Sequence, residues 1–253
     1  MKKFSVFIFV IIFTACQQTG IDSSNSINVQ TLVSVDDVKK AGRQLISLSK
    51  GLNKIEVNEQ INESSLIITV HGYKSEGYEW INALSAFSKA YSELYFYRYD
   101  WNICPDKAGE DLAKSIDSML IVNENFDNIQ IYGHSYGGLL ITFAAADLKT
   151  DLDTEIHTIA APLAGYPRIM DSCTLQYDVN TTLLYPTWDT NISHYQWRTQ
   201  KEQDGAFRDL DFDPQVIELP NSNITLLPDS MDGHRLGHNW SVTWVARAIL
   251  ENE

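Results

Sequence analysis

Short apolar runs alternate along the chain with longer segments whose apolar residues recur at helical spacing. Residues 66–70 are apolar at nearly every position, as expected of a strand covered on both faces. Further runs occupy residues 94–99, 129–132, 156–161, 182–185 and 224–227. Helical spacing is found in residues 79–91, 109–122, 139–146 and 242–250, and a helix is also expected within 33–52. This alternation predicts an α/β protein with a doubly wound, mostly parallel sheet flanked by helices.

The chain length fits a single α/β domain, which we place at residues 31–253. One connection, at about 186–222, is longer than usual and is treated as an insertion. It is polar and rich in aromatic residues. A lid or pocket wall and a surface excursion without a substrate role are equally weighted interpretations of it. The aromatic and imidazole side chains in question are Trp188, His194, Tyr195, Trp197, Phe207 and Phe212.

The first residues have the pattern of an export signal. Lys2 and Lys3 precede an apolar stretch, residues 4–13, that is short for a membrane span and typical of a signal-peptide core. We therefore predict a signal peptide at 1–15. The following Ala15-Cys16 resembles the lipobox of bacterial lipoproteins, which implies a lipidated Cys16, a polar tether over 16–30 and a place in the cell envelope. With Gln17 rather than aspartate after the cysteine, the resemblance favours the outer membrane; simple secretion after cleavage near Ala15 is the alternative.

Charge and motifs exclude several classes of function. The chain has 33 acidic and 19 basic residues and a net charge of −14, which argues against nucleic-acid binding and against docking on anionic lipid by charge. It contains no His-Glu-x-x-His, no Gly-x-Gly-x-x-Gly and no P-loop sequence. We therefore expect neither a metal nor a cofactor.

The most informative motif is the run Gly133-His134-Ser135-Tyr136-Gly137, which lies between a predicted strand and a predicted helix. In a Gly-x-Ser-x-Gly turn the serine occupies a sharp strand-to-helix bend, and the glycines allow the backbone to pack closely. Such a bend exposes the hydroxyl to a base, which a serine needs to become a nucleophile. We predict that Ser135 is a nucleophile.

Three features together resemble the α/β-hydrolases of the lipase and esterase type, from about residue 66 to the C-terminus. They are His71-Gly72 after an apolar strand, the Gly-x-Ser-x-Gly turn, and a histidine beyond the last strand. The resemblance implies the chain order nucleophile, acid, histidine. It also implies that backbone N–H groups of Tyr136 and Tyr73, with Gly72 as the alternative to Tyr73, form the oxyanion hole.

The chain order leaves candidates for the base and the acid. We favour His238, directly before the closing helix, over His234 as the base. The acid is expected after the strand predicted at 182–185, which favours Asp189; Asp204 and Asp178 are the rivals. Its role is to orient the histidine and stabilise the imidazolium.

Two cysteines remain once Cys16 is assigned to lipid. Cys104 and Cys173 each follow the carboxyl end of a predicted strand. In an oxidising compartment such a pair can form a disulfide, and two free thiols are the alternative.

These observations favour an exported serine hydrolase that cleaves carboxylic esters, of small molecules or lipids, through an acyl-enzyme on Ser135. Amide or thioester hydrolysis and acyl transfer use the same machinery. A catalytically silent binding or scaffold protein of the envelope is the hypothesis from a different class.

Overall fold

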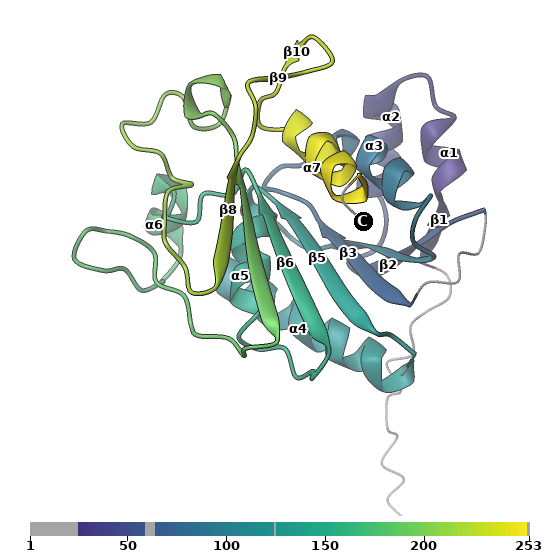
Figure 1. Ribbon diagram of the computed structural model, residues 1–253, viewed down its shortest axis with the longest axis horizontal. Coiled ribbons are helices and arrows are strands. Elements are labelled where there is room, and N and C mark those ends of the chain that lie inside the picture. Colours follow the sequence, from purple (N-terminus) through teal and green to yellow (C-terminus); the bar gives the residue numbers. More distant parts are fainter. Residues whose placement is uncertain (1–24, 59–63, 124, 252–253) are drawn as a thin grey trace, which may run out of the picture.

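The computed structural model describes residues 25–58, 64–123 and 125–251 of the chain (Figure 1). The predicted signal peptide at 1–15 and the predicted lipidation site Cys16 lie outside these ranges. The predicted tether at 16–30 is described only from residue 25 onward, and there the chain forms a strand and begins a helix. The folded body therefore starts before residue 31, where the sequence pattern had placed it.

Strands and helices alternate along most of this part of the chain. The strands are β1 (Ser26–Asn28), β2 (Gly51–Glu56), β3 (Ser65–Val70), β4 (Glu93–Arg98), β5 (Asn128–His134), β6 (Asp153–Ile159), β7 (Ile192–Arg198), β8 (Ser222–Leu226), β9 (Ser230–Met231) and β10 (His234–Arg235). The helices are α1 (Val29–Val33), α2 (Val38–Ile46), α3 (Tyr78–Phe87), α4 (Pro105–Val122), α5 (Tyr136–Ala144), α6 (Pro167–Ser172) and α7 (Trp240–Leu250), with a 3₁₀ turn η1 at Lys201–Gln203.

One large sheet organises the described residues. Its strand order is β1-β2-β4-β3-β5-β6-β7-β8, and β9 and β10 form a separate hairpin. Within the large sheet β2 runs antiparallel to β4, and the other neighbouring pairs are parallel. The predicted mostly parallel α/β sheet is confirmed.

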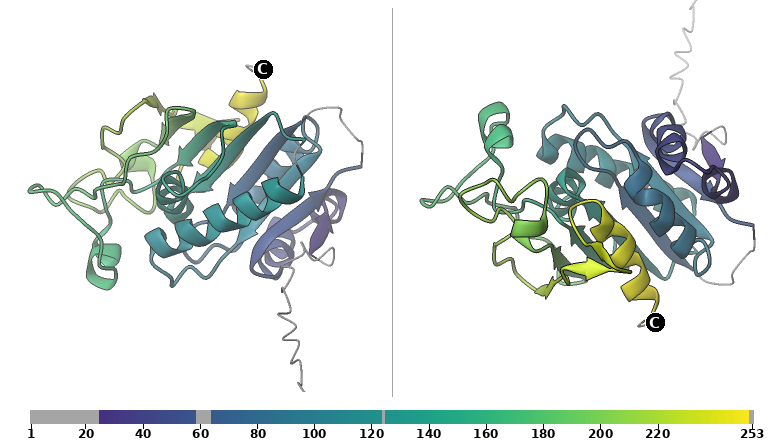
Figure 2. Two further views of the ribbon diagram at one scale, coloured as in Figure 1. Left: turned by 90° about the horizontal axis from the view of Figure 1, so that it is seen from below. Right: turned by 90° about the horizontal axis from the view of Figure 1, so that it is seen from above.

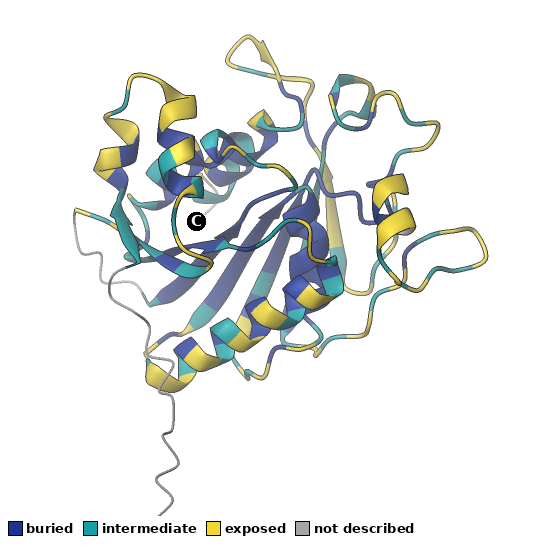
Figure 3. Cartoon of the chain, turned by 180° about the vertical axis from the view of Figure 1, so that it is seen from behind, coloured by how far each residue is buried: buried dark blue, intermediate teal, exposed yellow. Residues whose placement is uncertain are grey.

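Helices cover both faces of the sheet. Figure 2 shows α4 lying across one face and α7 across the other. The core on the first face packs α4 and α5 against the strands, and the core on the second packs α1, α2, α3 and α7 against them. Strand β3 is buried at every position, which explains its continuous apolar sequence, whereas α4 keeps an exposed outer side (Figure 3).

Sequence and structure differ in two regions. The helix expected within 33–52 ends at Ile46, and the chain then enters the antiparallel strand β2. Residues 182–185 form no strand; only an isolated bridge joins Leu183 to Tyr177. The strand β7 instead lies inside 186–222, so this range is not a simple insertion between strands. Among the described residues, every helix is too short or too polar to cross a bilayer.

The strand register brings the relevant loops together. Val70 of β3 pairs with Gly133 of β5, and His134 of β5 pairs with Ile159 of β6. The carboxyl ends of these three central strands therefore lie side by side at one end of the sheet, which is where open α/β sheets bind their ligands.

Candidate active site

Ser135 occupies the sharp bend between β5 and α5. Its backbone has φ 54° and ψ −120°, a conformation that side-chain-bearing residues rarely adopt. The flanking glycines make the bend possible, because a Cβ on Gly133 would lie 2.5 Å from the carbonyl oxygen of Gly137, and one on Gly137 would lie 2.5 Å from that of Val70. The predicted strand–turn–helix context of the motif is present.

The bend is fixed by the neighbouring strand and leaves the hydroxyl accessible. The Ser135 N–H donates to the carbonyl oxygen of Ile159 at 2.8 Å, which ties the bend to the end of β6. The residue is partly exposed, and its Oγ has no hydrogen-bond partner among the residues that the structure describes. It is therefore free to meet a ligand.

His238 lies beside this bend and is paired with Asp204. The imidazole Nδ1–H donates to Asp204 Oδ2 at 2.9 Å, and His238 and Ser135 line the same cavity. The His238 ring also meets Phe207 edge-on, with 5.0 Å between ring centroids. A neutral imidazole whose Nδ1 is protonated presents a bare Nε2, which is the form a general base requires.

Asp204 is fully buried and held on both oxygens. Thr199 Oγ1 donates to Oδ2 at 2.6 Å and the Ala206 N–H donates to Oδ1 at 2.8 Å. Burial alone would raise the pKa of this carboxyl, but the hydrogen bonds from His238, Thr199 and Ala206 outweigh it, so the pKa lies below its usual value. Asp204 is thus an anion beside the imidazole.

The structure does not place Asp189 against His238. Asp189 is exposed and lies three residues before β7, at the amino end of that strand, whereas the bend at Ser135 is at the carboxyl end of the sheet. The sequence pattern points to Asp189 because residues 182–185 are apolar enough to predict a strand there, but they form only an isolated bridge. Asp204 follows the strand that is actually present, β7, after the turn η1.

The other rivals lie elsewhere. His234 is on the exposed β10, where its ring stacks on Trp240. Asp178 closes a local turn by accepting from the N–H groups of Asn180 and Thr182, both at 2.8 Å. The histidine predicted as the more suitable base is therefore the one that the structure pairs with a carboxylate.

Two backbone N–H groups close to the bend, those of Tyr136 and Tyr73, lack an acceptor within the described protein. Tyr136 is the first residue of α5, so its N–H has no acceptor within the helix. Tyr73 follows the end of β3 in a loop that packs closely on the bend, since a Cβ on Gly72 would lie 3.0 Å from Ser135 Cβ. No described group accepts a hydrogen bond from either N–H. The assignment of the two groups to an oxyanion hole stays a prediction, and the absence of an acceptor among the described residues is compatible with it.

His71 supports this loop from beneath. Its Nδ1–H donates to the Gly72 carbonyl oxygen at 2.9 Å, while its Nε2 accepts from Arg98 Nη1 at 3.1 Å. The ring stacks on Tyr99 with 4.4 Å between centroids. Burial lowers the pKa of His71 to about 3, so the ring is neutral and fixed in this tautomer. His71 therefore positions the loop rather than exchanging protons.

His134, inside the motif, has a similar supporting role. Its Nε2–H donates to the backbone carbonyl oxygen of His238 at 3.0 Å. Burial lowers the pKa of His134 to about 3, and the nearby His238 adds to this effect. The neutral ring thus couples the bend to the base-bearing loop, a contact that the motif alone did not reveal.

A cavity of about 400 Å³ opens at these groups. This volume is within the range of small-molecule sites. Besides Ser135 and His238, its wall is largely aromatic and apolar and includes Tyr73, Trp101, Tyr136, Tyr166, Ile169 and Phe207.

No protein-family model matches the chain, and no curated protein matches it in sequence. Solved structures do match. A lipase of Bacillus licheniformis, BlEst2 in its propeptide form, aligns with TM-score 0.52 and 11% identity over 78% of this chain and 52% of that one. The carboxylesterase CesB of Bacillus subtilis aligns with TM-score 0.48 and 12% identity over 88% and 97%, and a putative thioesterase of Silicibacter sp. with 0.49 and 15% over 92% of each. The chain has the α/β-hydrolase fold.

Within this α/β-hydrolase fold, a second and smaller hollow of about 210 Å³ also reaches Ser135 and His238. It is polar, and its wall includes the buried Glu79. Burial raises the pKa of Glu79, although the hydrogen bond from Ser75 and the nearby His238 oppose this. Sequence reasoning missed Glu79, because a single acidic residue in a helical pattern carries no signal of burial.

The aromatic residues predicted to form a lid or pocket wall have divided roles. Phe207 alone of the six lines the larger cavity. His194, Tyr195 and Trp197 belong to β7, Trp188 borders a separate surface hollow, and Phe212 is exposed. The segment therefore contributes two wall residues, Ala206 and Phe207, and the carboxylate that pairs with His238, rather than a complete lid.

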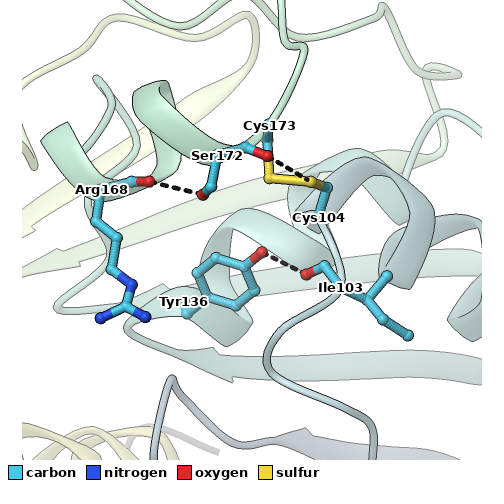
Figure 4. The surroundings of a disulfide bond; sticks show 6 residues. All are labelled: Ile103, Cys104, Tyr136, Arg168, Ser172 and Cys173. Atoms are coloured by element: carbon cyan, nitrogen blue, oxygen red, sulfur yellow. Dashed lines mark hydrogen bonds between the residues drawn. A yellow bond between two sulfur atoms is a disulfide. The ribbon is translucent and has the colours of Figure 1, made fainter.

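A disulfide joins Cys104 to Cys173, with the Cα atoms 5.7 Å apart (Figure 4). Cys104 precedes α4 and Cys173 follows α6, so the bond attaches the wall segment α6 to the body of the fold. Neither the larger cavity nor its surroundings present a metal site: in the described ranges no three His, Cys, Asp or Glu side chains gather in a way that would hold an ion.

Proposed function

We propose that the protein is a serine hydrolase that cleaves carboxylic esters through an acyl-enzyme on Ser135. The observation that carries the proposal is the pairing of His238 with the buried Asp204, in a cavity wall that also holds a strained, unpartnered serine. The fold, shared with solved carboxylesterases and lipases, is consistent with it. Binding alone would not require an imidazole oriented in this way.

The groups present account for each proton. His238 Nε2 takes the Ser135 hydroxyl proton as Oγ bonds to the ester carbonyl carbon, and the Tyr73 and Tyr136 N–H groups receive the oxyanion. Collapse breaks the bond to the alcohol, which leaves with the proton from His238. Water then loses a proton to His238 and attacks the acyl carbon; collapse breaks the bond between that carbon and Ser135 Oγ, His238 returns the proton to Oγ, and the carboxylic acid leaves. Asp204 remains ionised throughout.

Covalent labelling tests this function. We expect a fluorophosphonate probe to label the wild-type protein, and Ser135→Ala and His238→Ala to abolish labelling and p-nitrophenyl ester hydrolysis. His234→Ala is the matched control and should retain both. A folded wild-type protein that is never labelled would instead favour the catalytically silent binding or scaffold protein.

We further propose that the chain is exported and anchored by lipid on Cys16, in the outer membrane of a Gram-negative cell. The basic and apolar start of the sequence supports this, and the Cys104–Cys173 disulfide is typical of an oxidising compartment. Metabolic labelling with a palmitate analogue should mark the wild-type protein but not Cys16→Ala. Equal labelling of the two would exclude Cys16 as the lipidation site.

A further inference from the structure

The larger cavity has an unusual charge balance for this chain. Although acidic residues outnumber basic ones by 33 to 19, no aspartate or glutamate is among the described residues that line it. Of the wall residues that the structure describes, Arg168 has the one permanently charged side chain. A ligand in this cavity therefore meets a positive charge on an otherwise strongly negative protein.

The Arg168 guanidinium is free to bind a ligand. Its carbon lies 4.6 Å from the centroid of the Tyr73 ring, so the group is held on an aromatic face. Within the described parts of the chain it forms no ion pair, and none of its N–H groups has a hydrogen-bond acceptor. Lys74 Nζ lies 5.5 Å from the same ring and is likewise outside any ion pair described. The side chains of Arg168 and Lys74 therefore both lie against the Tyr73 ring, beside the site.

A disulfide and a hydrogen bond restrain the helix that carries Arg168. Arg168 lies in α6, whose end is attached to the start of α4 by the Cys104–Cys173 disulfide (Figure 4). Ser172 Oγ donates to the Arg168 carbonyl oxygen at 2.7 Å, which stiffens the short helix. On the opposite side, Tyr136 Oη donates to the Ile103 carbonyl oxygen at 2.6 Å, next to the disulfide. The segments that hold Arg168 and Tyr136 in place are therefore joined by the Cys104–Cys173 disulfide.

An arginine held on an aromatic face with its N–H edge unoccupied suits a planar anion, which it can bind through two hydrogen bonds. Resting on the proposed esterase function, we propose that the substrate is an ester that carries a carboxylate on the half that fills this cavity, with Arg168 as the residue that selects it. The apolar and aromatic wall accepts the carbon chain or ring between the carboxylate and the scissile bond.

Two matched pairs of substrates test the proposal and show which half carries the charge. Mono-4-nitrophenyl adipate and its methyl ester differ by a charge on the acyl half, and 4-acetoxybenzoate and its methyl ester differ by one on the alcohol half. We expect wild-type kcat/KM to favour the anion in one pair by about tenfold, since hydrogen bonds to charged groups are worth that much or more. Added salt should reduce this preference.

Variants separate charge recognition from structure. Arg168→Met should remove the preference, because kcat/KM should fall about tenfold more on the charged substrate than on its neutral partner, and Arg168→Lys should restore part of it. Arg43→Met, which removes an exposed positive charge from α2, is the control and should leave the preference intact. An unchanged preference in Arg168→Met, an equal loss on charged and neutral substrates, or no preference in the wild type would overturn the proposal.

A binding measurement keeps this result distinct from failure of the proposed function. Calorimetric titration of Ser135→Ala with monomethyl adipate and dimethyl adipate requires no turnover. Tighter binding of the anion that Arg168→Met abolishes would support the recognition site even if no ester is hydrolysed. Equal affinity within this pair and also for 4-acetoxybenzoate and its methyl ester, together with fluorophosphonate labelling of the wild type, would overturn the recognition site and leave the hydrolase proposal standing.

Discussion

The two halves of the candidate site are built in different ways. The half at β3 and β5 is made of main chain: Ser135 lies on a strained bend that requires Gly133 and Gly137 to lack side chains. The half carried by the segments after β7 and β8 is made of side chains: His238, Asp204 and Thr199 meet through hydrogen bonds. Backbone packing restricts the residue type at each position, whereas a side-chain network can be assembled from many places in a sequence.

Replacing Asp204, which belongs to the side-chain half, should have the largest effect on activity. Asp204→Asn should lower kcat by about 10⁴-fold, because an amide can donate to Nδ1 and so favour the tautomer in which Nε2 is protonated and cannot act as a base. Asp189→Asn should be nearly neutral, since Asp189 is exposed at the other end of the sheet. Ester hydrolysis by the two variants, with thermal unfolding to verify folding, measures this. Comparable losses in both would show that the pairing of His238 with Asp204 is not the catalytic one.

The same contrast explains how much could be predicted from the sequence. Strand β3 is a continuous apolar run because both of its faces are covered, and β5 places Ile129, Ile131 and Tyr132 around a single buried Gln130; both strands were located correctly along with the bend and its supporting loop. Strand β7 was missed because the residues that it buries include the polar His194 and Gln196. The remaining signal in the sequence is the alternation of aromatic and polar residues at Tyr195-Gln196-Trp197-Arg198.

Because the sequence pattern does not reveal β7, it also assigns the acid to a different aspartate. With β7 taken for part of an insertion, the chain order pointed to the aspartate after residues 182–185 rather than to Asp204. Neither the burial of Asp204 nor its contact with Thr199 has a sequence signature, because both depend on how the segment after β7 folds back. The bend at Ser135 and the loop after β3, by contrast, follow directly from local backbone geometry.

Glycine substitutions test the main-chain half. Gly137→Ala should destabilise the fold by about 3 kcal/mol, because the new methyl group would lie within 2.6 Å of the carbonyl oxygens of both Val70 and His71. Gly205→Ala is the matched control from the side-chain half, where a Cβ would meet nothing within 4 Å. Urea unfolding of the two variants measures the difference. If Gly137→Ala were as stable as Gly205→Ala, the close packing around the bend would not constrain the sequence.

Low pH should reduce the stability of the fold, because two histidines are buried in the main-chain half of the site. His71 and His134 have pKa values lowered to about 3 by burial, against about 6.5 in an unfolded chain. Between these values the unfolded state binds more protons, so stability is present above pH 6.5 and is lost as the pH falls toward 3, by about 1.4 kcal/mol per pH unit for each histidine. His134→Gln should therefore reduce the slope of unfolding free energy against pH by about one such increment, measured by urea unfolding from pH 7 to pH 4.5. The exposed His234→Gln should leave the slope unchanged, and equal slopes in all three proteins would mean that His134 is not held neutral beneath the bend.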